Sequence, residues 1–185
     1  TKDAGSLSPS WTNIKPGLPN YNITDVVVSA NNPEHIWVTF SEYKDTVKVY
    51  ESYDAGNSWA NITGESLPNL PVNCIVHQAS SNDDLYIGTD IGVYYKNNTM
   101  NDWVPFMNGL PNVIVKELEI HYDEGTISAA TYGRGIWKSP LNTLPSTNTK
   151  ENAFIPLSIY PNPANNYVSI QTPFHSDVTI RVYSL

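Results

Sequence analysis

Four acidic side chains fall in predicted loops where they could take part in acid–base chemistry: Glu42, Asp45, Asp90 and Asp102. Hydrolysis of a glycosidic bond usually needs two carboxylates about 5 to 9.5 Å apart, one of which is kept protonated. The same residue types also serve as turn caps and solvated loop acids. Because sequence spacing fixes no pair of carboxylates across separate elements, these acids alone do not define a reaction.

A second candidate cluster is the segment Thr131-Tyr132-Gly133-Arg134-Gly135. Arg134 between two glycines could extend into a groove, with Tyr132 as a stacking platform for a sugar ring. Alternatively, the glycines form a bulge that directs the chain into the next strand, and Arg134 caps carbonyls. A site that holds a substrate carboxylate with several arginines is not predicted, because the sequence has no other arginine before Arg181. Asp90, Tyr132 and Arg134 are therefore the candidate groove residues, and the catalytic residues stay unassigned.

Metal and cofactor chemistry finds little support in the sequence. Asp83-Asp84 and Asp123-Glu124 are adjacent acids that could contribute to a calcium site, which needs six to eight oxygens. Both pairs fall at predicted hairpin turns, where such residues are expected anyway. The histidines are scattered, and His77 and His121 are expected at equivalent strand ends. We expect no metal and no cofactor.

Composition predicts an all-β protein. The chain has 12 Tyr, 5 Trp and 14 Pro, and no helical stripe of apolar residues. Its net charge of −8 would repel a phosphate backbone, so no nucleic acid partner is expected. No run of about 20 apolar residues is present, so no transmembrane segment is predicted. The single Cys74 lies in an apolar run, where a small buried strand residue is expected.

The elements that position these residues repeat along the chain. Trp11, Trp59 and Trp103 recur at intervals of about 45 residues, which is typical of propeller blades. Each tryptophan is followed by a Leu-Pro signature, at Leu18, Leu67 and Leu110, and then by apolar runs in the same order. We therefore expect an outer strand at Trp11, full four-stranded blades over residues 25–62 and 73–106, and three further strands over residues 115–139.

The clearest single motif is the octapeptide from Ser52 to Trp59. Gly56 can adopt a positive φ, while Asp54, Ser52 and Ser58 can hydrogen-bond free backbone groups across a tight turn. The pattern S-x-D-x-G-x-S-W resembles the Asp-box of the BNR and sortilin-like repeat families. That resemblance implies a β-propeller, with this turn joining the third and fourth strands of a blade. It predicts that Trp59 is buried and that the turn is structural, on the face opposite Asp90, Tyr132 and Arg134.

The C-terminal segment has a different character. Residues 142–156 are polar and rich in Thr and Asn, which is typical of a linker. Tyr160-Pro161-Asn162-Pro163-Ala164 follows, with alternating strands expected at 167–171 and 178–183. This motif resembles the start of the C-terminal sorting domain of type IX secretion cargo, a small Ig-like sandwich. The resemblance implies the type IX machinery as a partner, and a secreted or outer-membrane-surface location. An ordinary rigid turn is the alternative.

Together these observations predict an all-β fold. A partial β-propeller of about three four-stranded blades at 1–141 is followed by the linker and by the first strands of an Ig-like β-sandwich at 157–185. Resemblance to xyloglucanase-type and sialidase-type propellers implies a secreted bacterial glycoside-hydrolase-like module with a polysaccharide or glycan as partner, its active site incomplete here. The alternative is a non-catalytic sortilin-like propeller that binds protein or glycan, or an accessory module of a secreted peptidase or adhesin.

Overall fold

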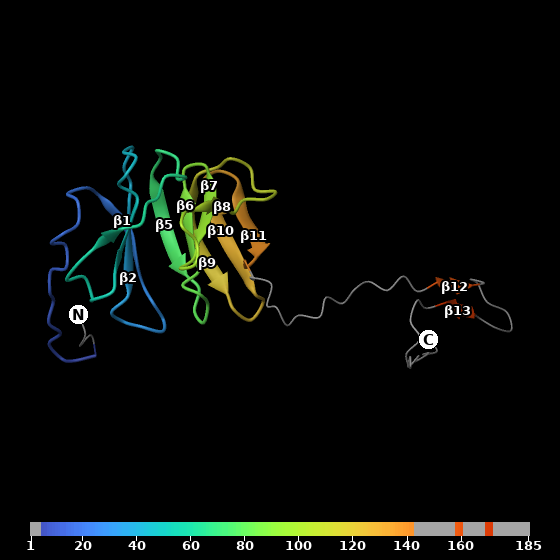
Figure 1. The fold of residues 1–185 in the computed structure, drawn as a ribbon, viewed down its shortest axis with the longest axis horizontal. Helices are drawn as coiled ribbons and strands as arrows, with labels where there is room; N and C mark the ends of the chain where they lie inside the picture. The colour runs from blue at the N-terminus through green and yellow to red at the C-terminus, as the bar shows by residue number, and fades with distance from the viewer. Residues whose placement is uncertain (1–4, 143–157, 161–168, 172–185) are drawn as a thin grey trace. The chain divides into compact units, whose positions relative to one another are not determined.

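A computed structural model describes residues 5–142, 158–160 and 169–171. Within these residues every regular element is a β-strand, which confirms the all-β prediction (Figure 1). The chain divides into two compact units, Thr1–Leu141 and Asn142–Leu185. No helix in the described part of the chain is long and apolar enough to cross a membrane.

The first unit contains three antiparallel sheets that follow one another along the chain (Figure 1). Their strands pair in sequence order, so the first strand of each sheet is followed outward by its second and third. The first sheet holds β1 (Ile23–Val28), β2 (Ile36–Phe40), β3 (Val49–Ser52) and β4 (Ala60–Asn61). The second holds β5 (Val72–His77), β6 (Leu85–Thr89), β7 (Gly92–Lys96) and β8 (Val104–Pro105). The third holds β9 (Val115–His121), β10 (Thr126–Thr131) and β11 (Gly135–Pro140). This is the arrangement of a partial β-propeller.

The strand register repeats from sheet to sheet. Each innermost strand has a bulge near its start, at Thr24 in β1, Asn73 in β5 and Lys116 in β9. The residue two positions after each bulge can be followed through its paired residues from the first strand to the third. In the three sheets this leads to Tyr50 of β3, Tyr94 of β7 and Trp137 of β11, which therefore occupy equivalent positions. The three sheets are therefore copies of one unit at the level of single residues.

The register corrects one sequence-based expectation. His77 pairs with Leu85, whereas His121 pairs with Thr126. Because the β9–β10 ladder extends one pair further than the β5–β6 ladder, the counterpart of His77 is Ile120. His77 and His121 are thus not equivalent.

The core lies between neighbouring sheets. Trp37 and Val49 of the first sheet pack against Ile75, Ile87 and Trp103 of the second. A second cluster joins Cys74, Tyr86 and Tyr95 of the second sheet to Val115 and Leu118 of the third. Gly88 permits this contact, because a Cβ there would lie 2.6 Å from Sγ of Cys74 and 2.7 Å from Val115. Cys74 is buried, as predicted.

The tryptophans at the repeat positions differ in environment. Trp103 is 1% exposed, and Trp59 is half-buried beside Leu18 and Tyr50, so the prediction of a buried Trp59 is correct in part. The outer strand predicted at Trp11 is wrong: residues 9–15 form no strand, and Trp11 is 81% exposed. Among the described residues, no strand pairs with residues 9–15.

The second unit contains an antiparallel pair, β12 (Ser158–Tyr160) and β13 (Ser169–Gln171), in which Ile159 pairs with Ile170. β13 falls within the strand expected at 167–171. Pro161, Asn162 and Pro163, and the strand expected at 178–183, lie outside the described residues.

Candidate functional site

The antiparallel order of strands divides the loops of the first unit between two faces. Turns between second and third strands, and connections from one sheet to the next, lie at one end. We call this the Asp90 face; its turns are residues 41–48, 90–91 and 132–134. Turns between first and second strands, and between third and fourth strands, form the opposite face, called the Asp54 face. Candidate groove residues and the octapeptide turn therefore lie on opposite faces, as the topology predicts.

Asp90 takes part in the contact between the second and third sheets. One carboxylate oxygen accepts a hydrogen bond of 3.0 Å from Nδ2 of Asn73. The same amide nitrogen donates to the carbonyl of Val115 at 3.1 Å. In the first sheet Thr24 makes the equivalent contact, from its hydroxyl to the carbonyl of Val72 at 2.7 Å. Asp90 thus orients an amide that joins two innermost strands.

Tyr132 and Arg134 lie on the turn between β10 and β11. The backbone N–H of Tyr132 donates to the carbonyl of Ile114 at 2.8 Å, one residue before the carbonyl that Asn73 contacts. Tyr132 thus contacts the Ile114 carbonyl directly, and Asp90 is linked through Asn73 to the next carbonyl, that of Val115. Both residues are therefore connected to the start of β9. The Tyr132 ring itself is 71% exposed. Arg134 is exposed too, and its carbonyl accepts from Nε1 of Trp137 at 3.0 Å, a contact that holds the turn.

The remaining acids do not join this neighbourhood through any described contact. Asp102 accepts hydrogen bonds from the backbone of Glu65, Ser66 and Trp103, at 3.1, 3.0 and 2.8 Å. It acts as a turn cap, which is the alternative the sequence left open. Glu42 and Asp45 lie in the turn between β2 and β3, and the buried Lys48 donates to the carbonyl of Glu42. Burial lowers the pKa of Lys48.

On the Asp54 face, the octapeptide forms a closed set of hydrogen bonds. Ser58 donates to Asp54 through its hydroxyl at 2.6 Å and through its backbone at 2.8 Å. Ser52 donates to Asp54 at 2.8 Å and accepts from the N–H of Gly56 at 2.8 Å. These bonds, the Ser58 hydroxyl first, lower the pKa of Asp54 to about 2. The carboxylate serves as a structural acceptor for the turn.

A buried polar cluster between the first two sheets carries no sequence signal. His35 contacts Glu51 at 2.7 Å, and the same Glu51 oxygen accepts from Nε1 of Trp37 at 2.8 Å. The ring of Tyr53 stacks on His35 at 4.1 Å. Neither the i to i+16 spacing of His35 and Glu51 nor their residue types predict this pair, because the β2–β3 register alone brings them together.

The acid pairs considered for calcium form no cluster suited to a metal in the described residues. Asp83 contacts Nε2 of His77 at 3.3 Å, while Asp84 is buried nearby. Burial raises the pKa of Asp84 and lowers that of His77. Glu124 pairs with Lys138 at 2.6 Å on the surface. Both pairs lie at hairpin turns, as expected.

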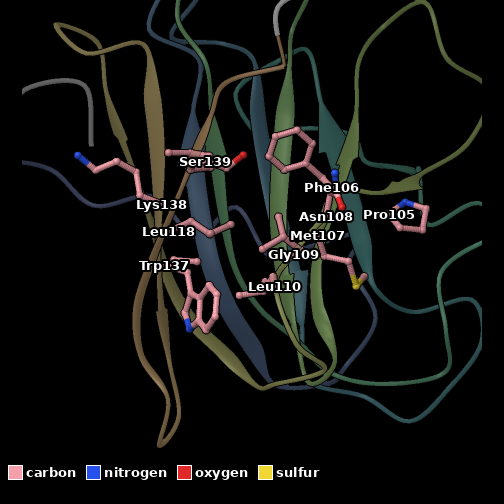
Figure 2. Close-up of a pocket in the computed structure, with 13 residues that line it drawn as sticks. Pro105, Phe106, Met107, Asn108, Gly109, Leu110, Leu118, Trp137, Lys138 and Ser139 are labelled. Atoms are coloured by element: carbon pink, nitrogen blue, oxygen red, sulfur yellow. The ribbon is translucent and has the colours of Figure 1, made fainter.

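An apolar groove of about 350 Å³ lies between the second and third sheets (Figure 2). Residues of β9, β10 and β11 form one wall, and the segment that follows β8 forms the other. Figure 2 shows Leu118 and Trp137 opposite Phe106 and Leu110. None of the candidate groove residues Asp90, Tyr132 or Arg134 lines it. We call it the interblade groove. The sequence patterns did not predict it.

Two solved structures that resemble this chain are GH74 enzymes. The chain resembles an ancestral GH74 enzyme with a TM-score of 0.51 and 21% sequence identity, over 67% of this chain and 15% of that one. It also resembles the GH74 xyloglucanase from Xanthomonas campestris, with a TM-score of 0.49 and 15% identity, over 61% of this chain and 20% of that one. No family model and no curated protein matches the sequence.

The similarity to the ancestral enzyme bears on the fold alone. At 21% identity the ancestral enzyme supports a β-propeller architecture for residues of the first unit. The chain spans only 15% of the length of that enzyme, so it corresponds to a small part of such a protein. The all-β, partial-propeller fold predicted from the repeats is thereby confirmed.

Proposed function

We propose that this chain is part of a glycoside-hydrolase-like β-propeller whose Asp90 face binds a polysaccharide, with the catalytic residues not complete within the chain. The observation that carries the proposal is the exposed ring of Tyr132, 71% accessible on a turn whose backbone is fixed to Ile114. A fixed, exposed aromatic ring offers a flat apolar surface to a sugar ring. The fold shared with GH74 enzymes agrees with a glycan as the ligand class.

Electrostatics at this turn also fit a neutral or weakly charged glycan. Arg134 supplies exposed guanidinium donors two residues from Tyr132, and Asp90 supplies acceptors nearby. The carboxylates of Asp102 and Asp90 are engaged in structural hydrogen bonds, so these two of the four candidate acids are not assigned as a hydrolytic pair. Binding without turnover is the expected behaviour of this chain.

The test is binding of xyloglucan and mixed-linkage β-glucan to the full chain, measured by affinity electrophoresis and calorimetry. Tyr132→Ala should weaken binding by about tenfold, since loss of one stacking ring removes about 1 kcal/mol or more. Tyr122→Ala is the matched control, because Tyr122 is exposed on the Asp54 face. Equal binding by both variants would refute the Tyr132 assignment. Reproducible hydrolysis abolished by Asp90→Ala would refute the absence of turnover.

We further propose that the second unit directs export through the type IX system to the cell surface or medium. Support comes from the Tyr160-Pro161-Asn162-Pro163 motif and the β12–β13 pair that flanks it. The experiment expresses the chain behind an inner-membrane signal peptide in a bacterium that has this system, with and without residues 157–185. Equal release of both forms into the medium would contradict the proposal.

A further inference from the structure

A second exposed tyrosine lies on the Asp90 face, far from Tyr132 along the chain. Tyr43 is 65% exposed and belongs to the turn between β2 and β3, residues 41–48. Tyr132 belongs to the corresponding turn between β10 and β11. Turns between second and third strands all open on this face, so both rings are presented on the same side of the first unit.

The backbone just before Tyr43 is fixed from inside the protein. Nζ of Lys48, a residue that is 1% exposed, donates to the carbonyl of Glu42. The same ammonium group donates to Oδ1 of Asn69 at 3.3 Å. Asn69 lies in the connection from β4 to β5, so Lys48 joins the Tyr43 turn to a second segment of the chain. A buried ammonium group needs such acceptors, because burying it without them is costly.

The backbone after Tyr43 is fixed from two other segments. Nζ of Lys44 donates to the hydroxyl of Tyr21, which precedes β1, and lies 4.8 Å from the centre of its ring. Nδ2 of Asn61 in β4 donates to the carbonyl of Thr46 at 2.7 Å. The Tyr43 turn is therefore held in place before any ligand arrives. Such pre-organisation lowers the entropic cost of binding.

The turn of the second sheet, between the two turns that carry the tyrosines, is short and has no aromatic residue. Only Asp90 and Ile91 separate β6 from β7, whereas residues 41–48 separate β2 from β3. Ile91 packs against the core, and Asp90 is bonded to Asn73. The Asp90 face therefore presents one exposed aromatic ring on each side of a short polar turn.

The order of the sheets sets the spacing of the two rings. The first sheet packs on the second, and the second packs on the third. Packed sheets lie about 10 Å apart, so the turns of the first and third sheets stand roughly 20 Å apart. A single sugar ring covers one tyrosine only. A ligand that contacts both must therefore be an extended chain of several sugars.

Charges on these turns favour an uncharged chain. The acids Glu42, Asp45 and Asp90 are interspersed with Lys44 and Arg134. Neither sign dominates, so a polymer with a charge on every sugar would meet like charges at several positions. Sugars joined by equatorial bonds, as in β-linked glucans, present flat C–H faces at regular intervals along the chain. Such faces are the apolar surfaces on which a tyrosine ring packs.

We propose that Tyr43 and Tyr132 are the two ends of an extended binding surface for an uncharged β-linked glucan chain, which crosses the second sheet at Asp90. Each ring stacks on a different sugar of the same chain, and Arg134 offers donors to its hydroxyl groups. Two contacts on one chain raise its affinity, because the second forms at a high effective concentration. The inference rests on the proposed function of the Asp90 face and deepens it, by adding a second contact and a minimum ligand length.

The probes are cellotriose and cellohexaose, a short and a long β-linked glucan, titrated into the full 185-residue chain by isothermal titration calorimetry. Cellohexaose is long enough to reach both rings, whereas cellotriose covers one ring at a time. We expect the wild type to bind cellohexaose at least about tenfold more tightly than cellotriose, because only the longer chain engages both tyrosines.

Tyr43→Ala is the decisive variant of the chain. It should bring the affinity for cellohexaose to within about threefold of that for cellotriose, because Tyr132 alone is left to stack. Tyr43→Phe keeps the ring and should retain the preference for the longer chain. Tyr122→Ala is the matched control, since Tyr122 is 56% exposed on the Asp54 face. Circular dichroism verifies that each variant is folded, as expected for substitutions at exposed positions.

Several outcomes would overturn the inference. These are equal affinity of the wild type for the two oligosaccharides, an unchanged length preference in Tyr43→Ala, and an equal loss of that preference in Tyr122→Ala. Absence of cellohexaose binding at about 1 mM would overturn it too. In each of these cases, xyloglucan binding that Tyr132→Ala weakens would leave the proposed function standing. A wild type that binds neither cellohexaose nor xyloglucan would overturn both, so the two failures are distinguishable.

Discussion

The indole of Trp103 donates a hydrogen bond of 2.9 Å to the carbonyl of Ile62, across the boundary between the first two sheets. This bond joins the fourth-strand regions of neighbouring sheets, while Asn73 and Thr24 join the innermost strands. Polar contacts thus fix both the inner and the outer edges of the interfaces between sheets. Such bonds set the relative position of the sheets, because apolar packing is not directional.

Trp103 should be the tryptophan on which stability depends most. Trp103→Ala is expected to lower the free energy of unfolding by about 3 to 5 kcal/mol, because it removes a large side chain that is 1% exposed. Trp103→Phe keeps much of the packing and should cost less, with about 1 kcal/mol of its loss from the missing hydrogen bond. Urea unfolding monitored by circular dichroism gives both values. Trp59→Ala, at the half-buried equivalent, should cost less than Trp103→Ala; the reverse order would contradict this account.

Acid should weaken the Asp54 turn over a defined pH range. Hydrogen bonds from Ser58 and then Ser52 lower the pKa of Asp54 from its ordinary 3.8 to about 2. Because the pKa is lower in the folded state, the stabilisation is complete above pH 3.8 and is lost as the pH falls toward 2. Asp54→Asn should flatten the dependence of the urea midpoint on pH in that range, and Ser58→Ala should reduce it in part. Identical pH profiles for wild type and Asp54→Asn would show that the turn is not coupled to folding.

Alanine substitutions at Gly56 and Gly125 separate the cost of backbone strain from the cost of close packing. Both adopt positive φ, 85° and 62°. A Cβ on Gly56 would lie 2.7 Å from Cβ of Ile14, whereas nothing lies within 4 Å of a Cβ on Gly125. Gly125→Ala should therefore cost about 1 to 2 kcal/mol from conformation alone. Gly56→Ala should cost clearly more, since Ile14 must shift and its contact with Trp59 weakens. Equal losses in urea unfolding would mean that Ile14 moves freely.

The repeat pattern was sufficient to predict most of the strands of the first unit. Tryptophans, Leu-Pro signatures and apolar runs recur in one order, and each apolar run became a strand. The outer strand at Trp11 was wrong because a strand needs a neighbour, and sequence similarity to Trp59-Ala60-Asn61-Ile62 does not provide one. The local sequence pattern predicts which segments are able to form a β-strand. Whether such a segment does form one depends on a neighbouring strand with which it can pair.

The candidate site was predictable only in part. Asp90 and Tyr132 fall on one face because strand order alone determines where turns lie. The link of Asp90 to Asn73 was not predictable, since it depends on a bulge that turns the amide toward the third sheet. The interblade groove likewise arises from the spacing of two sheets, which no sequence period encodes.

Cys74 offers a direct probe of the boundary between the second and third sheets. Burial raises the pKa of its thiol to about 12, so almost no thiolate forms at pH 8 while the sheets stay packed. Reaction with Ellman's reagent should be slow in the native chain and immediate in 6 M guanidinium, where the same single cysteine serves as the control. Native-state labelling then reports opening of this boundary.

Gly88→Ala should accelerate that labelling. The added methyl would meet Cys74 at 2.6 Å and Val115 at 2.7 Å, so the two sheets must separate locally to admit it. Gly125→Ala, which meets nothing within 4 Å, should leave the labelling rate near that of the wild type. If Gly88→Ala labels no faster than Gly125→Ala, then contact between Cys74 and Val115 does not control access to the thiol. A faster rate for Gly88→Ala alone would locate the weakest part of the core between β6 and β9.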